Sequence, residues 1–240
     1  MKPPYVAVGF HTFGFVQTKF TMSLLKASSY EGTRIAGFLD VTGPYTDEAR
    51  NRIVEAFLSG TNAEYLLMVD ADIEFDRDAI TKTVMVAETT KADVVWANYV
   101  LGNFSPSLFY KDENSFFGTP VPNLEPNQIY HGIYAGGTGW CLMRRGILEK
   151  MKTEYAAPWH WFDRDVIDSL KEPKVPMKMG EDMTFGKRVW ELGGTQVGYT
   201  GITLIHHKNF PHVPKFMAEA ISEGTTIKVV DEHGKALSKG

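Results

Sequence analysis

Short apolar runs alternate along the first part of the chain with longer segments of helical periodicity. The runs suit buried strands. They span residues 5–10, 35–41, 65–69 and 94–99. The segments between them repeat apolar residues every three or four positions, as amphipathic helices do. These segments span residues 17–29, 47–58 and 78–89. Because strands that alternate with such helices pair in parallel, the pattern predicts an α/β fold with a mostly parallel sheet.

The second of these helices has the clearest apolar face. Thr46 comes directly before it and can cap its first turn. Four apolar side chains at helical spacing are expected to face the core. They are Ala49, Ile53, Ala56 and Phe57.

The pattern becomes less regular after residue 100. Several prolines predict a long irregular excursion over residues 101–128. Beyond it, strands are expected over residues 129–134, 140–143, 195–201 and 202–206, and helices over residues 146–151 and 181–192. Residues 226–237 have the pattern of a small hairpin. We therefore expect one domain over residues 1–210, with residues 211–240 as a C-terminal extension packed on it.

The composition narrows the class of protein. The chain has 240 residues, of which 43% are hydrophobic and 22% charged, as in ordinary globular proteins. A formal net charge of −4 gives no overall attraction for nucleic acid or anionic lipid. No apolar run approaches the roughly 20 residues of a membrane span. Cys141 is the single cysteine, which excludes an internal disulfide and a cysteine-based zinc site. We expect a soluble cytoplasmic protein.

Two aspartates follow the third apolar run. If that strand continues through Asp70 and Asp72, both side chains leave the same face. Ligands of parallel α/β sheets gather at the carboxyl ends of strands, and carboxylate oxygens suit a hard divalent cation. Such a cation could hold the phosphates of a nucleotide. The alternative is that the aspartates cap the next helix, a role for which Asp76 and Asp78 are better placed.

Two further signals lie in the second half of the chain. Glu181 and Asp182 open a helix, where carboxylates are favoured by capping and by the helix dipole, and one of them could act as a general base. His206 and His207 end an apolar strand. Neighbours on a strand face opposite ways, so at most one reaches a given site. A neutral imidazole could complete the coordination of Mn²⁺, and the alternative is a structural histidine.

In this order along the chain, the signals resemble the inverting family 2-type glycosyltransferases of the GT-A fold, including small soluble members of phage type. The resemblance rests on Ala49-Arg50-Asn51, Asp70-Ala71-Asp72, the glycine-rich turn over residues 136–139, Glu181-Asp182 and His206. It covers roughly residues 5–210. It implies a GT-A-like, Rossmann-like α/β fold, with a nucleotide-binding half over about residues 1–100 and an acceptor half over about residues 101–210.

The resemblance also implies an activity. The expected enzyme is a hexosyl- or pentosyltransferase that depends on Mn²⁺ or Mg²⁺. It would move a sugar from a nucleoside-diphosphate sugar, with UDP as the expected nucleotide, to an acceptor hydroxyl by a single displacement with inversion. The acceptor stays open among a glycan, a protein side chain and a modified nucleobase. The sugar and the oligomeric state also stay open.

The resemblance also implies catalytic and metal-binding roles for the residues that match the family's motifs. Asp182 would be the catalytic base, with Glu181 as a supporting carboxylate, and Asp70, Asp72 and His206 would hold the metal. The helix dipole is expected to lower the pKa of Asp182 and leave it a modest base. Contacts with the donor are implied for Thr12, Asp40, Arg50, Asp70 and Gly137.

Some of these residues have simpler interpretations. Arg50 could be a solvated surface arginine, and Asp40 a turn residue. Trp159, His160 and Trp161 could form an acceptor platform, because aromatic rings stack on sugars and nucleobases. The alternative for this aromatic segment is a hydrophobic plug between a loop and the core.

Other functions share parts of the pattern. A non-catalytic module that binds a sugar nucleotide or a glycan would keep the pocket without turnover. A phosphatase of the haloacid dehalogenase type also places Asp-x-Asp after an apolar strand, but it continues with a small residue and a hydroxyl residue where this chain has Ile73 and Glu74. A nucleotidylyltransferase would share the fold, but its Gly-rich, Arg-containing signature is missing from residues 9–15.

Overall fold

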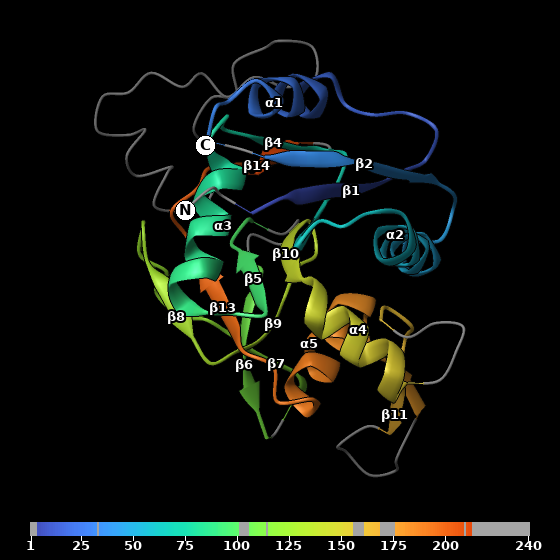
Figure 1. Ribbon diagram of the computed structural model, residues 1–240. Helices are drawn as coiled ribbons and strands as arrows, with labels where there is room; N and C mark the ends of the chain where they lie inside the picture. Colours follow the sequence, from blue (N-terminus) through green and yellow to red (C-terminus); the bar gives the residue numbers. More distant parts are fainter. Residues whose placement is uncertain are drawn as a thin grey trace.

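A seven-stranded sheet forms the centre of the molecule (Figure 1). The computed structural model describes residues 4–32, 34–100, 106–113, 115–155, 161–168, 176–208 and 210–212. In sheet order, the strands are β2 (Ile35–Thr42), β1 (Val6–Thr12), β3 (Tyr65–Val69), β10 (Trp140–Arg144), β5 (Val94–Ala97), β13 (Gln196–Tyr199) and β8 (Ile129–His131).

Most strands of this sheet run in one direction. β1 pairs in parallel with β2 and with β3, and β5 pairs in parallel with β13. β10 lies antiparallel between β3 and β5, and β8 is antiparallel to β13. The predicted mostly parallel sheet is confirmed. The antiparallel β10 was not predicted, because parallel pairing was inferred from the alternation of strands and helices in the first hundred residues.

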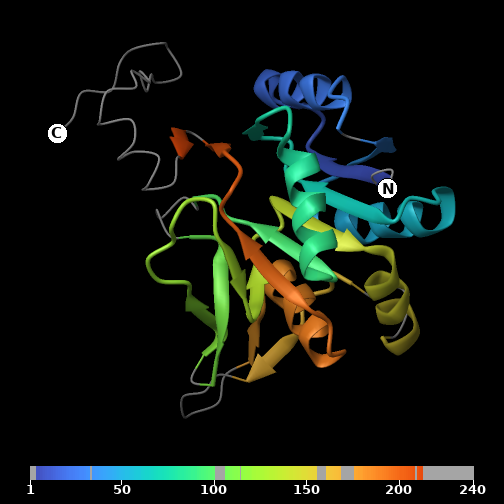
Figure 2. The same cartoon turned by 60° about the vertical axis from the view of Figure 1, so that its left-hand side comes forward.

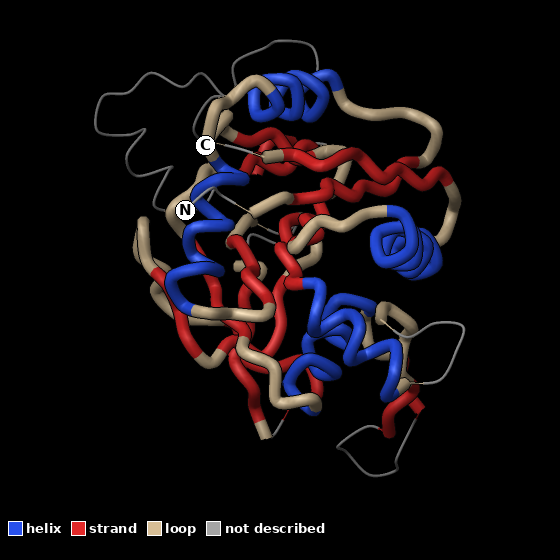
Figure 3. Tube along the Cα trace, in the orientation of Figure 1, coloured by secondary structure: helices blue, strands red, loops and turns tan. Residues whose placement is uncertain are grey.

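Five helices cover the two faces of the sheet in the described part of the chain (Figure 3). They are α1 (Thr18–Ser28), α2 (Thr46–Gly60), α3 (Ala79–Thr90), α4 (Arg145–Glu154) and α5 (Glu181–Glu191). Side chains of α1 and α3 pack in one apolar cluster against one face, and those of α2, α4 and α5 pack in a second cluster against the other. The carboxyl ends of β1 and β3 lie between these two layers.

Three smaller sheets complete the fold. One contains β4 (Ile73–Phe75), β14 (Leu204–Lys208) and β15 (Phe210–His212), with β14 in the middle. A second contains β6 (Leu108–Asp112), β7 (Ser115–Pro120) and β9 (Ile133–Gly136). The third is the pair β11 (Val166–Asp168) and β12 (Pro176–Lys178). Figures 1 and 2 show β6 and β7 at the opposite end of the molecule from α1.

Some local predictions were wrong. Thr46 is the first residue of α2 rather than its cap, and Tyr45 takes the cap position without a side-chain hydrogen bond. Ala56 is exposed, whereas Val54 is buried, so the inward face of α2 is rotated from the predicted one. This rotation also buries Arg50, and its polar partners explain why it can be buried.

The predicted irregular excursion contains regular structure. Residues 101–128 include the antiparallel pair β6 and β7. The predicted strand over residues 129–134 is divided at Gly132, whose φ of 71° belongs to the left-handed region that glycine adopts readily. The chain thereby leaves the main sheet after β8 and enters a smaller sheet as β9. The predicted hairpin over residues 226–237 lies outside the described residues.

Within the described residues, no helix has both the length and the apolar character that crossing a bilayer requires.

Candidate functional site

Asp70 and Asp72 lie in a tight turn directly after the fully buried strand β3. The strand does not continue through them. Instead, the N–H of Asp70 donates to the carbonyl of Gly139 at 3.1 Å, and the N–H of Ile73 donates to the carbonyl of Asp70 at 3.1 Å. The turn leads into β4, and both aspartate side chains remain partly exposed. The carboxyl end of β3 therefore presents two carboxylates at the sheet edge, as the sequence predicted.

His206 reaches these aspartates through strand pairing. β14 lies antiparallel to β4 with His206 opposite Ile73, and the N–H of His207 donates to the carbonyl of Asp72 at 2.9 Å. Nε2 of His206 lies 3.3 Å from Oδ1 of Asp72. One ligand atom from each of Asp70, Asp72 and His206 lies within 4.8 Å of the others. The three residues therefore form one cluster although the histidine is distant in sequence.

The adjacent histidine faces a different group. Nε2 of His207 lies 2.9 Å from Oε2 of Glu74, on the other side of β14. This follows from the alternation of side chains along a strand. Of the two histidines, His206 is the one beside the aspartates.

The chemistry of the cluster fits a divalent cation. Two carboxylates and one imidazole are suitable ligands for Mn²⁺, and the carboxylates also suit Mg²⁺. The imidazole of His206 is buried, whereas Asp70 and Asp72 are about one quarter exposed, at 24% and 23% of their side chains. The cluster is therefore enclosed by protein around His206 and open to a ligand around the two aspartates.

Arg50 connects this cluster to the start of α5. Its Nη2 donates to Oδ1 of Asp70 at 2.9 Å, and its Nη1 donates to Oε1 of Glu181 at 2.7 Å. The arginine side chain is only 5% exposed. Burial lowers the pKa of Arg50, but the charges of Asp70 and Glu181 outweigh burial and raise the pKa overall, so the guanidinium stays charged. The interpretation of Arg50 as a solvated surface residue is wrong.

Asp182 lies beside this ion pair, in the first turn of α5. Its Oδ1 accepts the N–H of Met183 at 2.8 Å. Burial raises the pKa of Asp182, and the neighbouring charge of Glu181 raises it further, against smaller opposing effects of Arg50 and backbone N–H groups. The expected lowering by the helix dipole is therefore wrong in direction, because desolvation is the larger effect.

Glu181 is held by two arginines. Arg50 binds Oε1, and Nη2 of Arg164 lies 3.3 Å from Oε2. Arg164 also lies 3.2 Å from Oδ2 of Asp47, through its Nε. Because both oxygens of Glu181 face cations, this carboxylate is fixed in place. Sequence reasoning missed Arg164, which lies in a segment without a recognisable motif.

Residues 48–152 match the sequence model of the family described as glycosyl transferase family 2. The chain resembles the family 2 glycosyltransferases. No curated protein sequence matches the chain.

Two solved structures share the fold. The crystal structure of A197 from STIV has a TM-score of 0.62 at 15% sequence identity, and the match covers 98% of each chain. The crystal structure of GalNAc-T7 with UDP, GalNAc and Mn²⁺ has a TM-score of 0.54 at 9% identity, and the match covers 85% of this chain and 43% of the other. At these identities the likeness concerns the fold, which is the GT-A-like fold that the sequence predicted.

In this glycosyltransferase-like fold, the glycine-rich turn before β10 packs against a buried tyrosine. A Cβ atom on Gly137 would lie 2.2 Å from the hydroxyl oxygen of Tyr99, and one on Gly139 would lie 2.8 Å from the same ring. The N–H of Gly139 donates to Oη of Tyr99 at 3.1 Å. Close packing therefore requires these glycines, and a contact of Gly137 with the donor stays a prediction. Tyr99 was missed because it follows an apolar strand and carries no motif.

Thr12 and Asp40 lie on β1 and β2, to the side of the aspartate turn that follows β3. Thr12 ends β1, its Oγ1 lies 2.9 Å from Oγ1 of Thr42, and its carbonyl accepts the N–H of Gly43 at 3.1 Å. Because β1 and β3 are neighbouring parallel strands, Thr12 lies at the same edge as the aspartate turn. Asp40 is exposed on the edge strand β2, opposite Phe10. Contacts of Thr12 and Asp40 with a nucleotide stay predictions.

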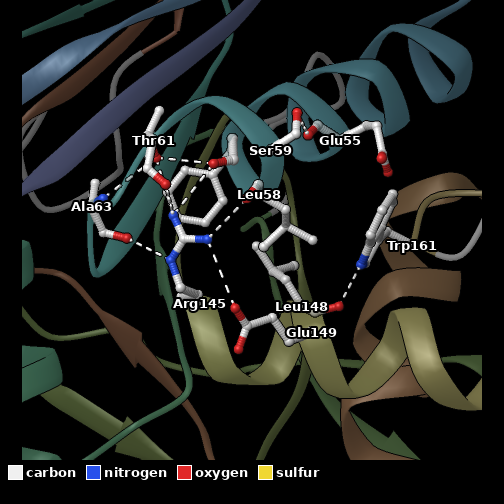
Figure 4. A network of polar contacts seen from close by, with 10 residues as sticks. Glu55, Leu58, Ser59, Thr61, Ala63, Arg145, Leu148, Glu149 and Trp161 are labelled. Carbon is white, nitrogen blue, oxygen red and sulfur yellow. Dashed lines mark hydrogen bonds and ion pairs between the residues drawn. The ribbon is translucent and has the colours of Figure 1, made fainter.

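The aromatic segment is described only from Trp161 onward. Trp161 is 1% exposed, and its Nε1 donates to the carbonyl of Leu148 at 2.8 Å (Figure 4). Oδ1 of Asn51 accepts the N–H groups of Trp161 and Phe162, at 3.3 Å and 2.9 Å. For Trp161, this is the hydrophobic plug that the sequence left as the alternative to an acceptor platform. Trp159 and His160 lie outside the described residues.

The helix that carries Arg50 is anchored to α4. Arg145 donates from Nη2 to the carbonyl of Thr61 at 2.8 Å and from Nε to the carbonyl of Ala63 at 2.9 Å (Figure 4). These carbonyls follow the carboxyl end of α2, where they have no partner within the helix. α2 is thus fixed at its end by Arg145 and near its start by Arg50 and Asn51, which sets the position of the guanidinium between the two carboxylates.

Proposed function

We propose that this protein is a metal-dependent glycosyltransferase that moves a sugar from a nucleoside-diphosphate sugar to an acceptor hydroxyl. The observation that carries the proposal is the double contact of Arg50 with Asp70 and Glu181. This contact makes the cluster of Asp70, Asp72 and His206 a neighbour of the carboxylate pair that opens α5. A cluster that could hold a cation and a candidate base, close together at one sheet edge, would suit sugar transfer from a nucleoside diphosphate.

Asp70, Asp72 and His206 would hold Mn²⁺ or Mg²⁺. The bound ion would supply a Lewis acid that stabilises the charge of the departing diphosphate, an effect of several kcal/mol in general. UDP is the nucleotide we favour, in line with the UDP and Mn²⁺ named for the GalNAc-T7 structure that shares the fold. Thr12, Asp40 and Gly137 would contact the donor. Arg50, whose guanidinium binds two carboxylates, would act on the donor through Asp70.

Asp182 would act as the catalytic base. It would accept the proton of the acceptor hydroxyl as the acceptor oxygen bonds to the anomeric carbon and the bond from that carbon to the diphosphate breaks on the opposite face. The result is inversion of the anomeric centre. The raised pKa of Asp182 supports this role, because a stronger base removes a proton more effectively near neutral pH. Glu181, held by two arginines, would support Asp182 rather than exchange protons.

The test is release of nucleoside diphosphate from a panel of UDP-, GDP- and dTDP-sugars, with water as the default acceptor. Release with Mn²⁺ and its loss with a chelator are expected from the wild-type protein. Asp182→Asn is expected to bind the donor with unchanged affinity and to lose release. No release from any donor, with nucleotide still bound, would favour a non-catalytic sugar-nucleotide-binding module. Near-normal release by Asp182→Asn would overturn the role of this residue.

A further inference from the structure

Tyr99 lies behind the candidate metal site, just after β5, and is 4% exposed. Its hydroxyl oxygen accepts the N–H of Gly139 at 3.1 Å. The carbonyl of the same Gly139 accepts the N–H of Asp70 at 3.1 Å. A single residue therefore connects the tyrosine hydroxyl to the backbone of the first aspartate.

The ring of Tyr99 also contacts the histidine of the cluster. The rings of Tyr99 and His206 lie edge to face, with centroids 5.4 Å apart and an interplanar angle of 85°. This geometry is favourable for aromatic pairs. Because the His206 side chain is only 4% exposed, the contact limits how its imidazole can turn.

The surroundings hold Tyr99 itself in place. Its N–H donates to Oγ of Ser107 at 3.0 Å. Gly137 and Gly139 leave space for the phenol that any larger residue would fill. Burial, with smaller contributions from the charges of Asp70 and Asp182, raises the pKa of Tyr99 well above its ordinary value, so the phenol stays neutral.

We propose that Tyr99 is a positioning residue for the metal site, fixing Asp70 through Gly139 and the imidazole of His206 through its ring. This inference rests on the function proposed above, since it requires a cation at Asp70, Asp72 and His206. Residues that orient metal ligands without binding the metal typically change metal affinity 10- to 100-fold when they are removed. Tyr99 would act on two ligands, one in the turn after β3 and one on β14.

The experiment measures the Kd of the full-length protein for Mn²⁺ without any donor, from the electron paramagnetic resonance signal of free Mn²⁺. Tyr99→Phe keeps the ring and loses the acceptor of the Gly139 N–H, so the Kd should rise about 10-fold. Tyr99→Leu also loses the contact with His206, and the Kd should rise by a larger factor. Tyr130→Phe is the matched control. Its hydroxyl likewise accepts a backbone N–H, that of Glu125 at 2.6 Å, but it lies on β8, and its Kd should stay at the wild-type value.

A purely structural role would lower the melting temperature of Tyr99→Phe and leave its Kd for Mn²⁺ at the wild-type value. That result would overturn the inference and leave the proposed function standing, provided that the wild-type protein binds Mn²⁺. If the wild-type protein binds no Mn²⁺, the proposed metal site fails and the role of Tyr99 fails with it. Tyr99→Phe is nearly isosteric, so it distinguishes a positioning role from a structural one even if Tyr99→Leu does not fold.

Discussion

Nη2 of Arg50 lies 2.9 Å from Oδ1 of Asp70, and this contact joins two regions that would otherwise repel each other. Asp70 belongs to the aspartate turn after β3, and the other nitrogen of the guanidinium binds Glu181 at the start of α5. Asp72 and Asp182 add further negative charge nearby. One buried cation therefore compensates part of the charge of this acidic cluster.

Removal of this cation should destabilise the fold. Arg50→Met leaves Asp70 and Glu181 without their buried partner, and breaking a buried ion pair typically costs about 3–5 kcal/mol of the free energy of unfolding. Since both carboxylates are partly exposed, we expect the lower end, about 3 kcal/mol. Unfolding in urea at pH 7 measures the effect.

Arg52→Met is the control for this variant on the same helix. Arg52 pairs with Glu48 on the exposed face of α2, and surface pairs are worth at most about 1 kcal/mol. Equal and small losses for both variants would contradict the assignment of Arg50 as the cation that stabilises the acidic cluster.

The two adjacent histidines should differ in their effect on metal binding. His206→Ala removes a ligand of the proposed site and should raise the Kd for Mn²⁺ by on the order of 100-fold, the upper part of the range for residues that only support ligands. His207→Ala removes the contact with Glu74 and should leave the Kd within about 3-fold of wild type, since His207 is not among the proposed ligands. Isothermal titration calorimetry with Mn²⁺ compares them. A larger effect for His207→Ala would mean that the cluster has been assigned to the wrong histidine.

Asp182→Asn should separate activity from stability. The pKa of Asp182 is raised in the folded protein, so the folded state binds its proton more tightly than the unfolded state does. The stabilisation that this gives is present at low pH and is lost as the pH rises through the raised pKa. Asp182→Asn removes this cost of ionisation, so at pH values above the raised pKa it should raise the free energy of unfolding, while it should lower kcat for transfer at least about 100-fold.

Asp165→Asn should change the free energy of unfolding in the opposite direction and serves as the comparison. Burial raises the pKa of Asp165, but hydrogen bonds from Lys187 and Arg188 outweigh burial and lower the pKa overall. Its contribution to stability is present at neutral pH and is lost as the pH falls through the lowered pKa. Urea unfolding at pH 4 and pH 8 should show Asp165→Asn less stable than wild type at pH 8 and Asp182→Asn more stable. The same sign for both variants would contradict the environment described for Asp182.

Gly137 should not tolerate a methyl group. In Gly137→Ala the new Cβ would lie 2.2 Å from the hydroxyl oxygen of Tyr99, so the turn or the tyrosine must move. We expect a loss of about 1–3 kcal/mol in the free energy of unfolding, the range for overpacked cores, together with weaker binding of Mn²⁺. Gly146→Ala is the control, because a Cβ there meets no atom within 4 Å and alanine favours a helix. A melting temperature of Gly137→Ala at or above that of Gly146→Ala would contradict this packing.

The sequence predicted those parts of the molecule whose signal is local. The strand over residues 65–69 was predicted with the bounds that the structure has, because five consecutive apolar residues suit a strand covered on both faces. Asp70 and Asp72 could be placed at its end for the same reason. The helix that begins at Glu181 followed from its apolar spacing and the glycines after it.

The missed parts depend on contacts between distant segments. Nothing around Arg50 indicates that a charged side chain is buried, because its partners come from two other elements. Tyr99 looks like the last apolar residue of a strand until Gly139 and His206 are seen against it. The direction of the Asp182 pKa shift likewise depends on burial by the rest of the fold, whereas the helix dipole could be inferred from position alone.

β14 reaches the aspartate turn through its pairing with β4 and through the hydrogen bond from the N–H of His207 to the carbonyl of Asp72, and the side chains of Glu74 and His207 that meet there are 133 positions apart. During synthesis, the sheet strands β1, β2, β3 and β5 leave the ribosome well before residues 204–208 do. A polypeptide that is unfinished at that stage has Asp70 and Asp72 but lacks His206. The proposed metal site would therefore be complete only after residue 206 has been synthesised, and shorter chains would bind the proposed ion less tightly.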